Sequence, residues 1–442
     1  MTSFNPDRID MLEDVRENGE NPFRMNQERD MSIETFLETY EAVEPPLPDV
    51  EYSLVGRVTR YNNFGGISFI DIEDETGSVQ VAFSGDNTDE YDAIESISVG
   101  DFVLATGVPA EERFDALSLF AESWTIVTKA LRNQPSFDGL NEQNTTVDRV
   151  GAFLSDDELA SNVQNRFDMI TEIRDLMTSN GFTEVDTPTL HAVASGADAE
   201  KFTTYSEDLD QELYLRVAPE LYLKRLVASG YENIFEIGNN FRNEDIDSSH
   251  NPEFTMMEVY QAYADWQDMM DLTEQIVLEL TDVEEIEQHD ILELAQEHVD
   301  DTLESAIENA NYDENPETER EMAFAIYENE VEDNIEAAFV TGLPASVSPL
   351  AKTNENGNPE RFELVIDGME VANGYSEQND PFEQREAFNN QSGEQDWEYV
   401  DDIAYGLPPT GGVGIGIDRL TMIATNTDSI RRIIPFPMHR EM

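Results

Sequence analysis

The chain has 442 residues, which is long enough for two or more domains that each have a hydrophobic core. It contains no cysteine, so disulfides and thiolate metal sites are excluded, and its five histidines lack HExxH or any similar ligand spacing. The balance of 25 Lys plus Arg against 96 Asp plus Glu gives a net charge of −71, yet 39% of the residues are hydrophobic, which excludes an acidic disordered protein.

A net charge this negative repels itself at ordinary salt, because the Debye length is ~10 Å at 0.1 M and falls to ~3 Å only at 1 M. We therefore expect a salt-rich cytoplasm in which a solvated acidic surface is screened. The same surface repels a polyanion, so a nucleic acid would be bound through local Arg clusters and stacking. The sequence shows no 18-residue apolar run and no charged-then-apolar leader near Met1, which predicts a cytoplasmic protein without a membrane span.

The N-terminal part of the chain is predicted to be helical. Apolar residues recur at every third position over residues 7 to 18, and this pattern ends at Gly19. Residues 33 to 43 predict a second helix, and the prolines between residues 44 and 49 are typical of a linker. Residues 1–50 are therefore assigned as an N-terminal helical extension.

The pattern changes to alternation with period two over residues 52 to 127. Four or five short strands, one turn at residues 75 to 77 and a helical stretch near residues 88 to 97 predict a small barrel of the oligonucleotide-binding type over residues 51–130. Phe69 lies on one of these strands. Its ring is equally suited to the barrel core and to a platform on which a base stacks.

A connector over residues 131–156 precedes a long helix, which is predicted over residues 157 to 180 and stops at Gly181. Residues 266 to 340 are helical in pattern and heavily acidic, which indicates an excursion at the surface. Strands are expected to resume near Phe362.

Two strand-like runs flank a polar loop between residues 233 and 261. Residues two apart on a strand share a face, so Arg242 and Glu244 are expected to point together before the loop. After the loop, four side chains are expected to share the other face: Phe254, Met256, Glu258 and Tyr260. Such a surface fits a nucleotide, with His250 in the loop for the outer phosphates, although an ordinary surface hairpin is the alternative.

Glu363 and Glu370 flank an Asp367-Gly368 turn in a second predicted hairpin. Two carboxylates that face each other across a hairpin would hold Mg²⁺ between ATP phosphates, whereas most glutamate pairs in so acidic a chain are solvated surface. Alternation favours the site, because three apolar side chains occupy the opposite face of the first strand: Phe362, Leu364 and Ile366.

A glycine-rich run, GGVGIGID, occupies residues 411 to 418. Its glycines allow close approach of the backbone to a ligand, and Asp418 is expected to open a helix. A tightly packed strand would explain the glycines equally well. No βαβ unit follows, so the run does not match a dinucleotide-binding fingerprint.

Five ordered segments together resemble the lysyl-tRNA synthetase family of class II. They are GFTEVDTPTL (residues 181–190), YLRVAPELYLKRL (214–226), FRNE with HNPEFTMMEVYQAYAD (241–265), FELVIDGMEVANGYSEQNDP (362–381) and GGVGIGIDRL (411–420). The similarity runs from about residue 8 to residue 438. It implies an α+β protein, in which an N-terminal OB-fold barrel binds the anticodon and residues 157–442 form a class II catalytic domain with a mixed or antiparallel sheet flanked by helices.

The resemblance implies a lysine–tRNA ligase. Such an enzyme uses ATP and Mg²⁺ to convert lysine to lysyl-adenylate and then transfers the lysyl group to the 3′ end of tRNA(Lys). It implies a homodimer, with the helix at residues 157 to 180 and the following strand in the interface. Because a carboxylate attacks the α-phosphorus of ATP, the work is positioning and offsetting of charge, with no general base required.

The resemblance also assigns roles at the nucleotide end of the site. Arg242 and Arg419 are the catalytic residues: Arg242 grips the α-phosphate, while Arg419 and His250 hold the outer phosphates. Phe254 stacks on adenine with Arg419 on its other face, and Glu244 completes the ATP site. Glu363 and Glu370 bind the metal.

For the lysine substrate, the resemblance assigns Glu220 to the α-ammonium and Glu377 to the ε-ammonium, which fits the need of each ammonium for an acceptor away from water. Five further residues shape this pocket: Gly196, Glu258, Tyr260, Asn373 and Tyr375. Gly374 is expected to let its strand bulge so that neighbouring side chains turn inward. In the barrel, Phe69 is assigned to base stacking and Gln80 to a base edge.

The sequence departs from the family where tRNA would be contacted. Tyr61, Asn62 and Gly66 stand where the family usually has basic residues, and Asn239 and Asp245 replace a frequent Arg and the usual Gly. This keeps an alternative open, namely a paralogue that activates lysine or an analogue and passes it to a non-tRNA acceptor.

Two other functions are disfavoured. A non-catalytic nucleic-acid-binding module conflicts with the retained Arg242, Glu363, Glu370 and Arg419. An aspartyl or asparaginyl ligase would bring no cation to Glu377.

Overall fold

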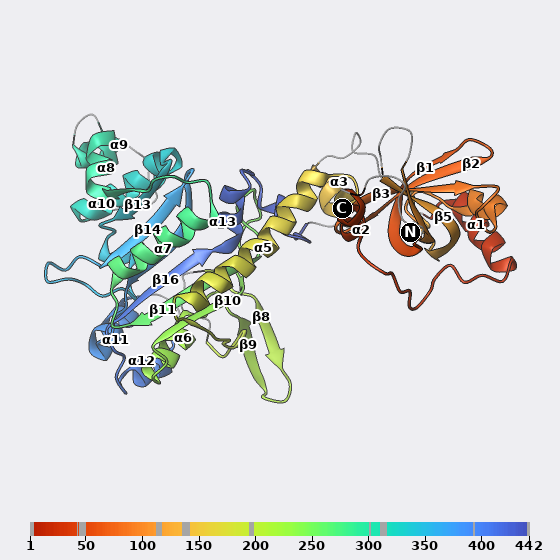
Figure 1. Cartoon of the computed structure of the whole chain (residues 1–442). Helices are drawn as coiled ribbons and strands as arrows, with labels where there is room; N and C mark the ends of the chain where they lie inside the picture. Colours follow the sequence, from red (N-terminus) through yellow and green to blue (C-terminus); the bar gives the residue numbers. More distant parts are fainter. Residues whose placement is uncertain are drawn as a thin grey trace. The chain divides into compact units, whose positions relative to one another are not determined.

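The computed structural model divides the chain into two compact units, Met1–Leu140 and Asn141–Met442 (Figure 1). The structure describes residues 4–41, 43, 50–111, 117–134, 142–193, 199–299, 302–309, 316–391 and 394–439. The linker prolines between residues 44 and 49 lie outside the described residues, and the division into four parts stays a prediction. Within the described ranges, the model has no helix that is both long and apolar enough to cross a membrane.

The first unit contains a closed five-stranded barrel, which confirms the OB-fold prediction. Its strands, in spatial order, are β1 (Tyr52–Asn63), β2 (Ile67–Asp74), β3 (Gly77–Ser84), β5 (Leu117–Thr128) and β4 (Phe102–Glu111). A short 3₁₀ helix, η1 (Tyr91–Ser96), occupies the stretch that was predicted to be helical. Alternation along β2 turns Ser68, Ile70 and Ile72 into the barrel, because neighbouring residues of a strand face opposite sides.

Both predicted N-terminal helices are confirmed, as α1 (Pro6–Glu17) and α2 (Ile33–Glu41). The backbone after α1 takes a positive φ of 86° at Gly19, a conformation that glycine adopts without a steric penalty. Apolar side chains of both helices join the hydrophobic core of the barrel, namely Val15 of α1 with Ile33, Phe36 and Tyr40 of α2. The N-terminal helices therefore belong to the barrel unit.

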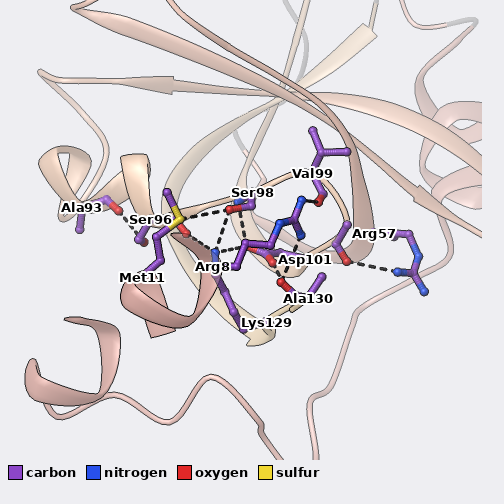
Figure 2. A network of polar contacts seen from close by, with 11 residues as sticks. Arg8, Met11, Arg57, Ala93, Ser96, Ser98, Val99, Asp101, Lys129 and Ala130 are labelled. Atoms are coloured by element: carbon purple, nitrogen blue, oxygen red, sulfur yellow. Dashed lines mark hydrogen bonds and ion pairs between the residues drawn. The ribbon is translucent and has the colours of Figure 1, made fainter. Parts of the chain in front are cut away.

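Polar contacts also tie α1 to the barrel (Figure 2). Arg8 donates hydrogen bonds to the carbonyls of Val99 at 2.7 Å and Ala130 at 3.1 Å. Beside it, the buried ammonium of Lys129 lies 2.8 Å from the carboxylate of Asp101, which also accepts from two backbone N–H groups. The buried Lys129–Asp101 pair and the Arg8 guanidinium are thus hydrogen-bonded, which is the condition for burial of charge.

The second unit is built on an eight-stranded sheet. Its strands, in spatial order, are β12 (Glu287–Asp290), β13 (Ala337–Thr341), β14 (Arg361–Ile366), β15 (Met369–Ser376), β16 (Thr410–Gly416), β11 (Glu253–Ala262), β10 (Asn233–Phe241) and β6 (Thr183–Glu184). The pairs β12–β13 and β10–β6 are parallel, and the other neighbours are antiparallel. The predicted mixed sheet flanked by helices is confirmed.

Three helices of the described chain cover one face of this sheet, and the opposite face carries the polar side chains of a cleft and, beside them, a second apolar cluster. The core cluster joins apolar residues of α5 (Asp157–Ser179), α7 (Trp266–Leu280) and α13 (Ile417–Ala424) to one side of the central strands. Met257 and Val259 of β11, for example, point to the helices, whereas Glu258 and Tyr260 line a cleft. Successive side chains of a strand therefore lie in turn on the face covered by these helices and on the face that carries the cleft.

The remaining elements surround the sheet. They are α3 (Glu142–Val147), α4 (Arg149–Phe153), a small sheet of β7 (Leu190–His191), β9 (Gln211–Leu215) and β8 (Thr203–Ser206), then α6 (Glu220–Ala228), α8 (Ile291–His298), α9 (Leu303–Asn309), α10 (Glu319–Ile326), the π-helix η3 (Tyr327–Val331), the 3₁₀ helices η4 (Glu332–Asn334), η5 (Ala345–Val347) and η6 (Ile430–Arg432), and α11 (Pro381–Asn390) with α12 (Trp397–Ile403).

The prediction that residues 266 to 340 form a surface excursion is wrong in two respects. Helix α7 is part of the core, since Met269 and Ile276 are fully buried against the sheet. Strands also resume earlier than Phe362, because β12 and β13 extend the main sheet. Acidic residues interrupt the short apolar patterns of this region. The sequence therefore does not reveal that the apolar side chains are buried against parts of the chain that are distant in sequence.

Candidate active site

A cleft of about 1110 Å³ opens on the site face of the sheet. Every described residue that the sequence predicted for the catalytic site lines it, whether from the β10–β11 hairpin, the β14–β15 hairpin and the residues that follow it, α6 or α13. Gly196 lies outside the described residues. The geometry thus gathers side chains that are up to about 200 residues apart in the chain.

The β10–β11 hairpin presents the predicted face, with one correction. Phe254, Met256, Glu258 and Tyr260 all line the cleft, as alternation predicts. Arg242 and Glu244, however, do not lie on a strand, because β10 ends at Phe241 and the backbone N–H of Asn243 donates to Glu200 instead of the ladder. Both side chains still reach the cleft from the loop.

The phosphate end of the cleft carries three basic side chains. The guanidinium of Arg242 lies 5.2 Å from the centre of the Phe254 ring, and its Nε is buried without a partner among the described residues. Arg419 donates to the carbonyl of Glu370 at 2.6 Å and lies 3.1 Å from Nε2 of His250. Predicted ATP-binding residues are therefore neighbours, with donors that remain to be satisfied.

Asp247 fixes the tautomer of His250. Its carboxylate lies 2.9 to 3.0 Å from Nδ1, while the Arg419 guanidinium faces Nε2. An arginine nitrogen only donates, so Nε2 accepts and the proton of the neutral imidazole is on Nδ1. Sequence reasoning missed Asp247, although its position in the polar loop three residues before His250 is a signal for such a contact.

Glu363 and Glu370 come together as predicted. The turn between β14 and β15 has positive φ at Asp367 (49°) and Gly368 (69°), which is the conformation of a tight hairpin turn. The amide of Asn373 donates to Oε1 of Glu363 at 3.3 Å and to Oε1 of Glu370 at 3.1 Å. Two carboxylate oxygens thus converge on one point.

A β-bulge creates this convergence, but not at the predicted position. Leu364 pairs with Ala372 and Val365 pairs with Glu370, so Val371 is the extra residue. The bulge places Glu370 and Asn373, three apart in sequence, on the same face. Gly374 keeps regular pairing, and its lack of a side chain serves packing, since a Cβ there would lie 2.6 Å from the Phe362 ring.

The carboxylate pair fits a magnesium ion that is also bound by nucleotide phosphates. Burial, together with the charge of Glu370, raises the pKa of Glu363 to about 8, with Arg361 acting in the opposite direction. A divalent cation would relieve that cost. Among the described residues, no group of three or more His, Cys, Asp or Glu is arranged to hold a metal without help, and Mg²⁺ in nucleotide sites characteristically uses one or two carboxylates plus phosphates.

The amino-acid end of the cleft holds a buried cluster of charge. Glu220 opens α6, and its Oε1 accepts from the hydroxyl of Tyr375 and from the Lys224 ammonium. Lys224 also forms an ion pair with Glu377. Both oxygens of Glu377 are buried and lack a well-oriented hydrogen-bond donor among the described residues. A buried carboxylate in this condition has unused capacity for a cationic ligand.

The pKa values of the cluster reflect an excess of carboxylates. Burial and the neighbouring Glu220 raise the pKa of Glu258 to about 8, against the hydrogen bond from Tyr260. Burial also raises the pKa of Glu377 to about 8, although Lys224 opposes the shift. Burial alone would lower the pKa of Lys224, but Glu220 and Glu377 raise it well above its ordinary value. The pocket is thus short of positive charge.

The glycines of β16 leave room for these carboxylates. A Cβ on Gly412 would lie 2.0 Å from Oε1 of Glu377 and 2.6 Å from the Tyr260 ring. Asp418 does not open α13 as expected, because Gly416 is the cap residue. The Asp418 carboxylate instead accepts from Arg166 at 2.9 Å and from the backbone of Thr255 at 2.8 Å, which ties α13 to α5 and β11.

In the barrel unit, Phe69 and Gln80 both lie on the outer face. The neighbours of Phe69 along β2, Ser68 and Ile70, are buried, whereas Phe69 is partly exposed. Its ring meets that of Phe64, which is 71% exposed, edge to face at 6.2 Å. The core interpretation of Phe69 is therefore wrong, and the ring is free to act as a platform.

Sequence reasoning missed two cationic residues of the site. Lys224 lies four residues after Glu220, the spacing of an ion pair on a helix, which is the signal that was available. Arg361 lies two residues before Glu363 on β14 and pairs with it at 2.5 Å. Asn373, which was assigned to the lysine pocket, contacts the carboxylate pair instead.

Two family descriptions match the chain. The description "tRNA synthetases class II (D, K and N)" matches residues 142–440, and "OB-fold nucleic acid binding domain" matches residues 52–127. The chain belongs to the class II tRNA synthetases and is an ATP-dependent ligase of that class.

Its curated relatives include several lysine–tRNA ligases. The Thermotoga maritima enzyme is 33% identical over 99% of this chain and 96% of its own length. The Enterococcus faecalis enzyme is 37% identical over 98% of this chain and 96% of its own, and the Methanospirillum hungatei enzyme is 40% identical over 88% and 86%. The resemblance found in the sequence motifs is therefore confirmed over nearly the full length.

Proposed function

We propose that this protein is a lysine–tRNA ligase, which activates lysine with ATP and transfers it to the 3′ end of tRNA(Lys). The observation that carries the choice of lysine is the amino-acid end of the cleft, where Glu220, Glu258 and Glu377 are buried around one ammonium. A neutral or anionic side chain would leave these carboxylates without a partner. Lysine brings two ammonium groups.

In the proposed binding mode, Glu220 accepts from the α-ammonium and Glu377 from the ε-ammonium of lysine. Tyr375 orients Glu220 through its hydroxyl, and Tyr260 orients Glu258 at 2.9 Å. The α-carboxylate then points along the cleft toward Arg242. Selectivity arises because each buried acceptor is satisfied only by a donor that carries charge.

Activation requires that two anions, the lysine carboxylate and the α-phosphate of ATP, meet in line. Arg242 offsets the charge at the α-phosphorus, and its stacking contact with Phe254 holds the guanidinium in place. Arg419 and His250 face the outer phosphates, which leave as pyrophosphate. The 3′ hydroxyl of tRNA then attacks the mixed anhydride, and AMP leaves.

Glu363 and Glu370 would hold Mg²⁺, with Asn373 and Arg361 orienting the carboxylates. When bound, the ion would neutralise phosphate charge and orient the nucleotide. Before the nucleotide binds, the ion pair with Arg361 compensates the charge of Glu363.

The outer face of the barrel is proposed to read the anticodon, with Phe69 as a stacking platform, Phe64 as its exposed neighbour and Gln80 at a base edge. Stacking on a ring does not rely on the phosphate contacts that salt weakens, which suits a protein of net charge −71 in a salt-rich cytoplasm. We also propose a homodimer through α5, where Phe167 is 45% exposed beside a groove of about 630 Å³.

Amino-acid-dependent exchange of pyrophosphate into ATP, measured in multimolar KCl with each amino acid, tests the first step. Charging of total tRNA from the same source tests the second. We expect exchange with lysine and charged tRNA(Lys). Exchange without charged tRNA would favour the paralogue that uses another acceptor, and absence of lysine-dependent exchange would overturn the proposed function.

A further inference from the structure

Lys224 lies at the lysine pocket, yet the binding mode described above gives it no part. Its side chain is 0% exposed, and the cleft is lined by Glu220, Tyr375 and Glu377 in front of it. The ammonium therefore sits behind the two carboxylates, on the protein side, 5.2 Å from the centre of the Tyr375 ring. A buried ammonium is costly unless it is paired, so its position calls for a reason.

The ionisable groups that face Lys224 come from four parts of the fold. They are Glu220 on α6, Tyr375 on β15 with Glu377 directly after that strand, Tyr399 on α12, and Glu258 with Tyr260 on β11. With every carboxylate ionised, three negative charges less one ammonium leave a charge of −2. Glu236, beside Glu258, is already paired with Arg216. The two ammonium groups of lysine match the remaining charge.

The contacts of Lys224 also leave one oxygen free on each carboxylate. Lys224 and Tyr375 share Oε1 of Glu220, so Oε2 has no part in either contact. On Glu377, Lys224 approaches Oε2, while Oε1 lies on the side of Gly412. One ammonium therefore holds both carboxylates from behind.

We propose that Lys224 is a positioning residue for substrate selection, whose ammonium holds Glu220 and Glu377 side by side, favours their ionised forms and leaves their other oxygen atoms to the two ammonium groups of lysine. This inference rests on the proposed lysine pocket and deepens it. Without the internal ammonium, these buried carboxylates would retain a proton up to a higher pH than in the parent protein. A protonated carboxyl does not attract an ammonium group, so lysine binding would first require loss of that proton.

The test compares the parent protein with Lys224→Met, which keeps the length of the side chain and removes the charge. In pyrophosphate exchange, the KM for lysine is expected to rise at least about tenfold at pH 7.5 and to recover partly at pH 9, with the KM for ATP unchanged. Calorimetry in buffers of different ionisation enthalpy measures the protons released as lysine binds. The variant is expected to release more protons than the parent.

Two further variants make the result decisive. Arg225 is the next residue of α6 and forms ion pairs with Asp396 and Asp402, but it does not line the cleft. The control variant Arg225→Met removes these ion pairs and should leave the KM for lysine unchanged. Lys224→Gln retains a hydrogen-bond donor but carries no charge. If the Lys224→Met variant does not bind ATP, the Lys224→Gln variant takes its place in the test. A Gln variant that binds lysine like the parent, with the same proton release, would overturn the role of the charge. A parent that shows no lysine-dependent exchange would refute the proposed function instead.

Discussion

At the amino-acid end of the cleft, Glu220 and Glu377 are buried and each is paired with the buried Lys224, whereas at the phosphate end Arg242 and Arg419 line the cleft beside His250. The first arrangement offsets only part of its negative charge and leaves a fixed deficit of positive charge. The second keeps unsatisfied donors, such as Nε of Arg242, for an incoming polyanion.

This difference shows how one cleft distinguishes its two substrates. Selection among amino acids needs buried acceptors. When the wrong amino acid binds, these acceptors are left without a hydrogen-bond partner, which weakens its binding. Binding of ATP, which every member of the reaction class shares, needs strong and adaptable donors. Changes at the phosphate end should therefore affect activation with every amino acid, and changes at the amino-acid end should affect lysine alone.

The largest effect is expected for Arg242→Ala, which removes the cation at the α-phosphorus. Loss of a preorganised donor at a reacting centre costs about 10²–10³-fold in rate. Pyrophosphate exchange should fall by this amount with lysine and with any other amino acid. Arg385→Ala on α11, which breaks an exposed pair with Asp401 on α12, is the matched control. Unchanged turnover in the Arg242 variant would dismiss the β10–β11 hairpin as the nucleotide site.

Glu377→Gln should come next, because a neutral amide replaces a charge-assisted acceptor. The loss of about 1.5–3 kcal/mol corresponds to about 10–150-fold in kcat/KM for lysine. The KM for ATP should stay the same, in contrast to the previous variant. If exchange with lysine continues at the parent rate, the assignment of the ε-ammonium pocket is wrong.

Glu363→Gln is expected to raise the Mg²⁺ concentration required for half-maximal exchange by about tenfold, as loss of metal-site partners does elsewhere. Asp367→Asn in the turn of the same hairpin removes an equal charge at an exposed position and serves as the control. A magnesium titration that is identical for both variants would speak against the carboxylate pair.

A smaller effect is expected for Gly412→Ala, whose Cβ would displace the Glu377 carboxylate. Overpacking of this kind costs about 1–3 kcal/mol, so we expect about a tenfold loss in lysine kcat/KM. Gly416→Ala on the same strand is the matched control, since the nearest atom to its Cβ would be 3.6 Å away. Equal losses in both variants would show that the strand, not the pocket, is sensitive.

The smallest effect follows from pH. The pKa of Glu258 and that of Glu377 lie at about 8 in the fold, above the ordinary 4.5, so the folded protein holds protons that lysine must displace. Loss of the one proton on Glu377, the acceptor proposed for the ε-ammonium, should raise lysine kcat/KM about fivefold between pH 7 and pH 8, and the rise should level off above. The protonated carboxyls favour the fold at low pH, and this contribution is lost as the pH rises through 8. Added lysine should accordingly raise the melting temperature more at pH 8 than at pH 6.

Local patterns were sufficient to predict much of the site. Alternation placed Glu258 and Tyr260 on one face of β11 and put Phe362 and Leu364 opposite Glu363, because the period of a strand is independent of its surroundings. The barrel strands followed from the same alternation. Alternation does not reveal the role of an individual residue. Those roles were inferred from the resemblance of the sequence motifs to the lysyl-tRNA synthetase family.

Features that depend on contacts distant in sequence were not predictable in this way. The strand ends at Phe241 because Asn243 pairs with Glu200, and the bulge falls at Val371 because the register of β14 requires it. Lys224 was noted only as a letter of the motif at residues 214–226 and was given no role, since its pairing with Glu377 joins residues more than 150 positions apart. Such pairings are set by tertiary packing, which a local period does not contain.

The scarcity of lysine gives the protein a practical property. Of its four lysine side chains, Lys129 and Lys224 are 0% exposed and locked in ion pairs. Lys352 donates to Asn379, and Lys201 stands over the Tyr214 ring at the wall of the cleft. Amine-reactive dyes, cross-linkers and immobilisation resins that target lysine will therefore react at two side chains, and labelling at Lys201 will report directly on occupancy of the cleft.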